Sequence, residues 1–185
     1  MELGDIEDVR INRNQDFVRT RMRYQDIISV EDQLKWFNGL SDINDWYFIA
    51  THNEKKIGLF HVKDINWKDK SGTSGGFIWN RSLKGSFEPG LAILALMDFA
   101  FFELRLTHLK AHYHEDFKEI VRLNEQLGYK IVDKAENGYS IAMVDKKAYL
   151  AKATQFRETA LQLMGRKRAL SDPHGLIDKI RNQDI

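Results

Sequence analysis

Hydrophobic positions change their spacing along the chain, from helical near the N-terminus to alternating in the middle. Residues 5–23 carry scattered apolar side chains among many charges, which predicts helical segments with a break near Asn12–Asn14. A second helix is expected after Ser29, because a serine followed three residues later by an acid, Asp32, is typical of a helix start. Gly39 marks its end.

The centre of the chain predicts an antiparallel meander of three strands. Trp46–Ala50 is aromatic and β-branched, and Lys56–Ile65 resumes the strand pattern after a polar turn at His52–Lys55. Thr73–Trp79 follows a polar connection and is the third strand. The first half therefore runs helix, helix and then a meander.

The second half predicts strands that alternate with helices. Gly90–Leu106 is apolar over most of a helical circumference, so we expect a helix buried against a sheet. A strand at Leu109–Tyr113 and an amphipathic helix at Glu115–Leu127 follow, and Gly128 ends that helix as a C-cap glycine does. Two last strands are predicted: Tyr129–Val132 and Tyr139–Val144, joined by a turn at Glu136–Gly138.

This element order favours an α/β (α+β) fold with a mixed, mostly antiparallel central sheet and helices on both faces. The spacing changes once more after residue 145. Apolar side chains then fall at intervals of 4, 3, 4 and 3 residues, which is typical of a helix that packs on another helix: Tyr149, Ala153, Phe156, Ala160 and Leu163. We therefore expect a domain over residues 1–145 and a helical extension over residues 146–185. The extension packs on that domain or on a partner subunit, in which case the protein is a homodimer.

Composition narrows the function classes. The chain has 185 residues, 43% of them hydrophobic, and a net charge of +1, which gives no overall drive toward nucleic acid or an anionic membrane. The absence of cysteine excludes disulfides, a cysteine nucleophile and cysteine metal ligands. No apolar run approaches the ~20 residues of a membrane helix. Met1–Arg10 lacks the basic and apolar parts of a signal peptide, so we expect a cytoplasmic protein.

Two segments, placed in this element order, resemble a known family. Arg122–Ile131 contains a helix that ends in Leu-Gly-Tyr before a strand, and Asn12–Arg19 contains Arg-Asn followed by Val-Arg. Together they resemble the Gcn5-related N-acetyltransferase family, in particular a branch that acts on nucleotide-linked amino sugars or protein N-termini. The resemblance covers residues 5–145. It implies transfer of an acetyl group from acetyl-CoA to the primary amine of a small acceptor, with no metal.

The resemblance also implies where acetyl-CoA binds. The third and fourth strands should separate to admit the pantetheine arm, and backbone amides at the start of the Gly90–Leu106 helix should bind the diphosphate. Amides at the end of the third strand should polarise the thioester carbonyl. The implied donor-binding residues are Ile78, Trp79, Gly85, Ser86, Phe87, Gly90, Leu91, Ala92 and Asn124.

The loop that precedes the Gly90–Leu106 helix departs from the family pattern. Phe87 stands where an Arg or Gln is usual, and Glu88 brings a carboxylate close to the diphosphate. If CoA binds, Glu88 should point away and Arg81 or Lys84 should supply positive charge. The alternative is an ordinary strand-to-helix connection with Pro89 as the first helical residue.

Candidate catalytic residues are His112, His114 and Asn124. The two histidines flank Tyr113 on a strand, so they share one face, and histidine titrates near neutrality. They are equally compatible with a solvated or structural role, and with a metal pair that lacks an evident third ligand. Asn124 occupies the place of the family's general acid, which is usually tyrosine. An amide can hydrogen-bond a thiolate or the donor but cannot protonate it.

Candidate acceptor-binding residues are Arg13, Asn14, Arg19, Met22 and Trp36. Arginine forks suit a phosphorylated acceptor. The alternative is a solvated basic face paired with nearby acids, with Trp36 in the core. Two other functions stay open: acetylation of a protein N-terminus, and a catalytically weak or inactive protein of this fold that acts in binding or assembly.

Overall fold

A six-stranded sheet forms the centre of the molecule, in the order β1-β2-β3-β4-β6-β5. The structure is a computed structural model that describes residues 1–83 and 85–163. The strands are β1 (Trp46–His52), β2 (Lys55–Asn66), β3 (Ser71–Ile78), β4 (His108–His114), β5 (Lys130–Lys134) and β6 (Tyr139–Asp145).

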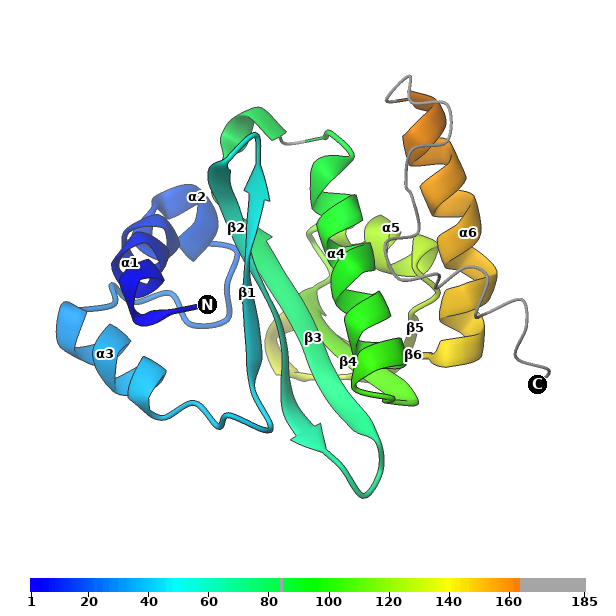
Figure 1. Cartoon of the computed structure of the whole chain (residues 1–185), viewed down its shortest axis with the longest axis horizontal. Coiled ribbons are helices and arrows are strands. Elements are labelled where there is room, and N and C mark those ends of the chain that lie inside the picture. Colours follow the sequence, from blue (N-terminus) through cyan, green and yellow to red (C-terminus); the bar gives the residue numbers. More distant parts are fainter. Residues whose placement is uncertain (84, 164–185) are drawn as a thin grey trace.

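Helices cover both faces of this sheet (Figure 1). One face carries the N-terminal helices: α1 (Ile6–Asn14), α2 (Asp16–Arg19) and α3 (Val30–Asn38). The other face carries α4 (Glu88–Asp98), α5 (Lys118–Gln126) and α6 (Lys146–Leu163). Short 3-10 turns lie at Leu3–Asp5, Arg81–Leu83 and Glu136–Gly138. The mixed sheet with helices on both faces confirms the fold class expected from the sequence.

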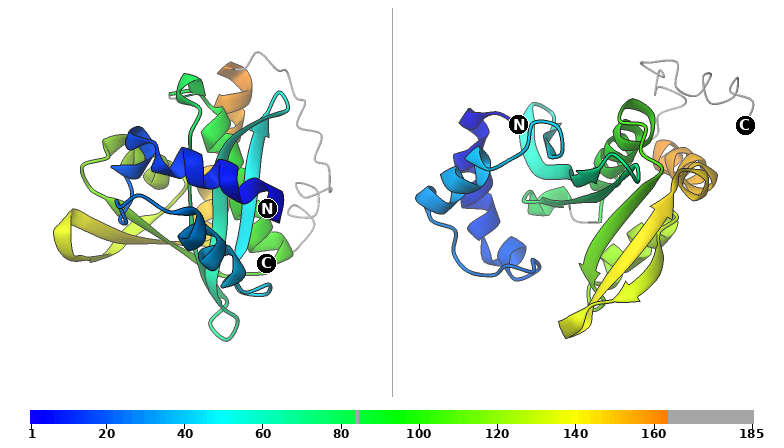
Figure 2. Two further views of the ribbon diagram at one scale, coloured as in Figure 1. Left: turned by 90° about the vertical axis from the view of Figure 1, so that its left-hand side faces the viewer. Right: turned by 90° about the horizontal axis from the view of Figure 1, so that it is seen from below.

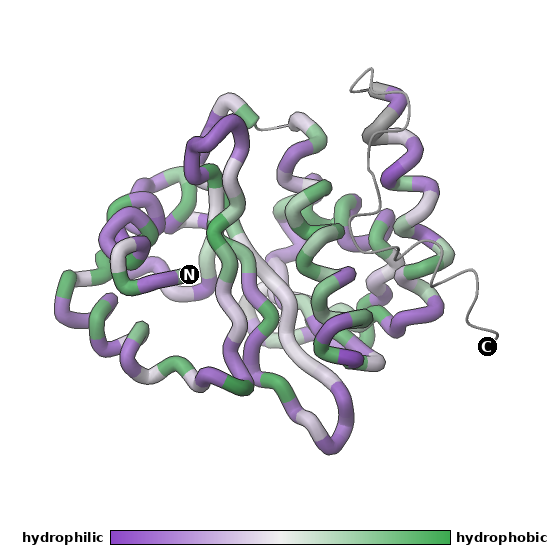
Figure 3. Tube along the Cα trace, in the orientation of Figure 1, coloured by the Kyte–Doolittle hydropathy of each residue, from purple (hydrophilic) through white to green (hydrophobic). Residues whose placement is uncertain are grey.

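Local signals place most element boundaries. The Ser29 hydroxyl accepts from the Asp32 amide at 3.0 Å and caps α3. Gly128 adopts φ +93° after α5, a conformation that glycine reaches without a steric cost. The expectation of one helix from Gly90 to Leu106 was wrong: α4 ends at Asp98, and a π-helical turn follows over Phe99–Glu103. Hydrophobic residues concentrate along α4 and the strand centres, whereas the β1–β2 turn is hydrophilic (Figure 3).

The sheet consists of two antiparallel halves that meet over a short parallel contact. Strands β1, β2 and β3 form one half, and β4, β6 and β5 form the other. Only Ser71–Thr73 of β3 pair with His108–Lys110 of β4. Beyond this contact β3 continues to Ile78 and β4 to His114 without pairing to each other. The halves therefore diverge, as the view from below shows (Figure 2).

The core lies between the sheet and α4, and α6 contributes to it. Tyr149 and Ala153 of α6 are buried in the same cluster as Met97 and Leu109. The Tyr149 hydroxyl donates to the Asp98 carboxylate at 2.5 Å, and Arg157 forms an ion pair with that carboxylate. This part of the extension therefore packs on its own domain. The side chains of Ala160 and Leu163 and all of residues 164–185 lie outside the described residues.

Candidate active site

The diverging strands leave a slot between β3 and β4. The Trp79 amide donates to the Ile57 carbonyl of β2 at 2.9 Å. Because successive residues of a strand direct their amides to opposite edges, the amides of Gly76 and Ile78 face β4. Of the two expected thioester-polarising amides, that of Trp79 is thus engaged in the sheet, while that of Ile78 borders the slot. The five residues of β3 beyond Thr73 make the slot roughly 16 Å deep at about 3.3 Å per residue.

A buried hydroxyl chain closes the slot where the strands separate. The Ser74 hydroxyl donates to the Lys110 carbonyl of β4 at 3.2 Å and lies 2.5 Å from the Tyr129 hydroxyl. Since the Ser74 proton is used, Tyr129 is the donor in the second contact. Tyr129 is 4% exposed, and burial raises the pKa of its phenol above the ordinary range. The tyrosine of the Leu-Gly-Tyr segment therefore forms the closed end, which we call the vertex of the slot.

The open end, or mouth, lies at the start of α4, where the loop residues Gly85, Ser86 and Phe87 precede the helix. Hydrogen bonds from Ser86 and from the amides of Glu88 and Phe87 lower the pKa of the Glu88 carboxyl. The carboxyl therefore lies close to the amides at the start of α4, where the resemblance places a diphosphate. The expectation that Glu88 points away applies to the protein with CoA bound and stays a prediction.

Other predicted groups at the mouth are also engaged. The Leu91 amide donates to the Phe87 carbonyl within the helix, at 2.9 Å. The Arg81 guanidinium lies 4.2 Å from the Phe17 ring centroid, a cation–π contact with α2. A Cβ at Gly90 would lie 2.5 Å from the Phe156 ring, so α6 contacts α4 closely here. Ala92 lines a separate apolar groove of about 300 Å³ between α4 and β1, and Lys84 lies outside the described residues.

Histidines lie along the slot on the face of the N-terminal helices. His112 is exposed on β4, and its pKa is lowered chiefly by partial burial and next by Arg23 and Lys63. His114 at the strand end accepts from the Asp116 amide through Nδ1 at 3.3 Å. The same nitrogen lies 3.5 Å from the Asp116 carboxylate. Both histidines thus place a ring able to accept or relay a proton beside the slot.

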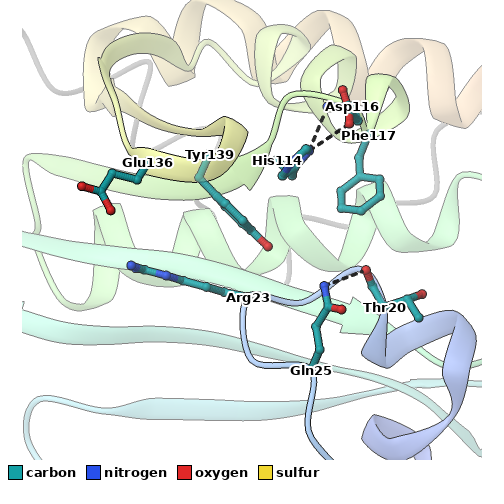
Figure 4. A pocket seen from close by; sticks show the side chains of 8 residues that line it. All are labelled: Thr20, Arg23, Gln25, His114, Asp116, Phe117, Glu136 and Tyr139. Carbon is teal, nitrogen blue, oxygen red and sulfur yellow. Dashed lines mark hydrogen bonds and ion pairs between the residues drawn. The ribbon is translucent and has the colours of Figure 1, made fainter.

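A pocket of about 530 Å³ opens beside His114. Its walls come from the connection after α2, the end of β4 and the β5–β6 turn (Figure 4). The His114 ring packs between Phe117 and Tyr139, with centroid separations of 5.7 and 5.1 Å. The remaining lining residues are Thr20, Arg23, Gln25, Asp116 and Glu136. Sequence reasoning missed Gln25 and Tyr139, because neither residue type is distinctive before the fold brings it to the pocket.

The predicted acceptor residues hold the wall of this pocket in place. Arg13 donates to the Tyr24 carbonyl and Arg19 to the Gln25 carbonyl, both at 2.7 Å. Asn14 both donates to and accepts from the backbone of Ile28, at 2.9 Å each. These three side chains fix the connection that carries Arg23 and Gln25.

Arg10, Arg21 and Arg23 complete a basic cluster with Arg13 and Arg19, and two of these three are also engaged. Arg10 pairs with Glu7, and Arg21 pairs with Glu119. Among the described residues, only Arg23 of this cluster makes neither an ion pair nor a hydrogen bond. Arg23 lies along the pocket wall, below Tyr139 in the close-up view (Figure 4). A guanidinium in this state is available to an anionic group.

The other predicted residues lie elsewhere around the slot. The Asn124 amide donates to the Ile120 carbonyl of its own helix at 2.8 Å. Met22 is partly buried, and Trp36 packs edge-on against Tyr47 with centroids 5.1 Å apart. Within the described ranges, no group of three His, Asp or Glu side chains is placed to hold a metal ion, and no helix is long and apolar enough to cross a membrane.

Comparison with solved structures finds the same architecture. A domain from Methanocaldococcus jannaschii aligns with a TM-score of 0.70 and 17% identity, over 78% of this chain and 94% of that chain. Spermidine N-acetyltransferase from Vibrio cholerae, solved with CoA and spermine, gives 0.67 and 18%, over 81% and 95%. Aminoglycoside acetyltransferase AAC(6')-Ib, solved with coenzyme A, gives 0.70 and 15%, over 83% and 96%.

These likenesses confirm that the chain has the fold of the Gcn5-related N-acetyltransferases expected from the sequence. No protein-family model matches the sequence, and no curated protein matches it. At identities of 15–18% the comparison establishes the fold, and the chemistry must be argued from the site.

Proposed function

We propose that this protein is an acetyl-CoA-dependent N-acetyltransferase that acts on the primary amine of a small acceptor. The observation that carries the proposal is the slot, since β3 and β4 pair over only three residues and then diverge. An extended thioester arm that enters at the mouth reaches the vertex between unpaired strand edges. Two of the similar structures are acetyltransferases solved with coenzyme A, which supports this donor.

The reaction is a direct transfer. The amine nitrogen bonds to the thioester carbon, and the carbonyl π pair moves to oxygen. The amine proton passes to His112, which its lowered pKa keeps neutral at physiological pH. The intermediate collapses, the C–S bond breaks, and the thiolate takes up the proton from the histidine. Holding both substrates in one site supplies much of the rate.

For the acceptor we infer an amine attached to an anionic group, of which a nucleotide-linked amino sugar is one example. Arg23 supports this inference, because it lines the pocket without a partner among the described residues. Asp116 and Glu136 at the rim attract the ammonium end of such a molecule. A polyamine, such as the spermine in one of the similar structures, is the alternative class of acceptor. Its positive charges would repel the Arg23 guanidinium.

The donor is tested first, by thermal shift with acetyl-CoA. Binding to the folded state raises the melting temperature by mass action, by an amount equivalent to about 2.7 kcal/mol at a hundredfold excess over Kd. No shift at millimolar acetyl-CoA contradicts the proposal. Glu88 at the mouth is the observation that favours the alternative, an inactive binding protein, and binding without any transfer would support that alternative.

The acceptor is tested with a panel read by release of free thiol. The panel contains a nucleotide-linked amino sugar, spermine and a short peptide with a free N-terminus. We expect Arg23→Gln to raise KM for the anionic acceptor about tenfold, since one charged hydrogen bond contributes 1.5–3 kcal/mol. Arg122→Gln on the exposed face of α5 is the matched control. Equal KM values for R23Q and the wild type would contradict the role of Arg23.

A further inference from the structure

His61 of β2 lies level with the vertex of the slot. In the sheet it pairs with Tyr47 on one side and with Gly75 on the other. Gly75 is two residues beyond Thr73, the last β3 residue that pairs with β4, and His112 is two residues beyond its partner Lys110. Side chains two residues apart on a strand share a face. His61, Gly75 and His112 therefore form one row across the sheet, where the slot begins.

Gly75 gives the His61 ring access to the slot. A Cβ at this glycine would lie 2.9 Å from both Cε1 and Nε2 of the imidazole. Non-bonded contacts of a Cβ atom are not this short, so any residue other than glycine would displace the ring. With glycine here, the Cε1–Nε2 edge lies over the β3 backbone and is directed toward β4. Nε2 is therefore the ring nitrogen on the slot side.

The surroundings keep this imidazole uncharged. Tyr47 packs on it with centroids 5.1 Å apart, and burial lowers its pKa to about 4, with Lys63 as the next contribution. Asp64 and Asp45 act in the opposite direction more weakly, and β3 contains no charged residue. No hydrogen bond to His61 is found among the described residues, whereas a neutral imidazole carries one N–H to donate.

We propose that His61 is a catalytic residue whose neutral imidazole donates a hydrogen bond from Nε2 to the carbonyl oxygen of the bound thioester. This inference rests on the proposed acetyltransferase function. As the amine bonds to the carbonyl carbon, the oxygen gains the π pair and becomes an oxyanion. His61 stabilises that charge and keeps its own proton, while His112 receives the amine proton. The Trp79 amide cannot act here, because it donates to Ile57.

Replacing His61 should reduce turnover and leave donor binding in place. Loss of one oxyanion donor costs about 10²–10³ in kcat. We expect this loss in His61→Ala, and partial recovery in His61→Gln, because the amide restores an N–H donor. His108→Ala, at the paired start of β4, is the matched histidine control. Acetyl-CoA thermal shifts of all variants report whether the fold and the slot are intact.

The pH profile separates a donor from a base. A donor that stays neutral leaves the profile of H61Q between pH 5 and 8 parallel to that of the wild type. If His61 were instead a general base, H61Q would be as inactive as H61A, and that outcome overturns the assignment. So does an H61A enzyme whose kcat lies within about twofold of the wild type.

Two further measurements do not require that the acceptor be identified. Acetyl-CoA should shift the Nε2 resonance of His61, and CoA, which lacks the carbonyl, should not. In Gly75→Ala this difference should vanish, because the methyl group displaces the ring. Equal shifts with both ligands contradict the hydrogen bond to the carbonyl.

The outcomes distinguish failure of the proposed function from failure of the role of His61. If the wild type neither binds acetyl-CoA nor transfers the acetyl group, the proposed function fails. If the wild type does both and H61A has unchanged activity, only the role of His61 fails.

Discussion

The vertex and the mouth of the slot differ in how completely they suit a thioester donor. At the vertex, Ser74 and Tyr129 form a closed hydrogen-bond chain, and the ring nitrogens of His61 and His112 have no hydrogen-bond partner within residues 1–83 and 85–163. At the mouth, the protein's own Glu88 carboxylate lies against the amides of the α4 N-terminus. The vertex therefore keeps imidazole groups open to the slot, whereas at the mouth a carboxylate lies close to the helix amides.

Substitutions at the vertex should therefore change turnover, and substitutions at the mouth should change donor affinity. Two anions cannot share the same amides without repulsion. Either Glu88 moves aside when the donor binds, or the donor binds through the slot with weakened diphosphate contacts.

The partly buried histidine at the vertex predicts acid sensitivity. The folded pKa of His61, about 4, lies below the ordinary histidine value of 6.5, so the unfolded chain binds more protons between these two pH values. The free energy of unfolding therefore falls as pH decreases from 6.5 to 4, by up to about 3 kcal/mol. Urea titrations across this window measure the slope, and His61→Gln should flatten it. A slope unchanged in H61Q would show that other groups cause it.

The hydroxyl chain at the vertex predicts unequal costs for its two members. Ser74→Ala leaves the buried Tyr129 hydroxyl without a partner, which costs about 1–3 kcal/mol of unfolding free energy. Tyr129→Phe leaves Ser74 still bonded to the Lys110 carbonyl and should cost about 1 kcal/mol. Denaturant unfolding of both variants tests the order, and a larger loss in Y129F would contradict this description of the chain.

The α4–α6 contact beside the mouth predicts a size limit at Gly90. A methyl group there would overlap the Phe156 ring, so Gly90→Ala should lower the free energy of unfolding by about 1 kcal/mol. The ring can move, which keeps the effect small. Phe156→Leu should rescue part of the loss in the double variant. Additive losses in that double-mutant cycle would show that the two residues do not interact.

Removing the carboxylate at the mouth should strengthen donor binding. Two unit charges about 4 Å apart repel by ~1 kcal/mol in water, so Glu88→Gln should tighten acetyl-CoA binding about fivefold. Lowering the pH through the depressed pKa of Glu88 should act in the same direction in the wild type and not in E88Q. Calorimetry measures both, with Glu119→Gln on α5 as the control variant. Weaker binding to E88Q would show that Glu88 helps the donor.

Much of the fold was predictable from local chemistry. The Ser29 cap, the Gly39 and Gly128 helix ends and the strand alternation lie close to where the sequence placed them. The end of α4 was not predictable, because the apolar stretch continues through the π-helical turn at Phe99–Glu103 without a change in composition. Hydrophobic spacing cannot distinguish these two helix types when apolar side chains continue around most of the helix.

The site was harder to predict, because it depends on pairing between distant strands. His112 and His114 could be selected from one strand, but His61 gains its place only through its register with Gly75. The glycine pair at Gly75–Gly76 was the available signal, since it marks close approach of neighbouring side chains. Arg13, Asn14 and Arg19 were predicted to bind the acceptor, and in the structure their side chains hydrogen-bond the backbone of residues 24–28.

The most direct test of the slot is a backbone amide NMR titration of the full chain with acetyl-CoA. We expect the largest shifts at Ser74–Ile78 and His112–His114, on the two unpaired strand edges, with a second group at Gly85–Gly90. Absence of shifts on both strand edges at millimolar donor would contradict the account. So would shifts confined to the apolar groove between α4 and β1.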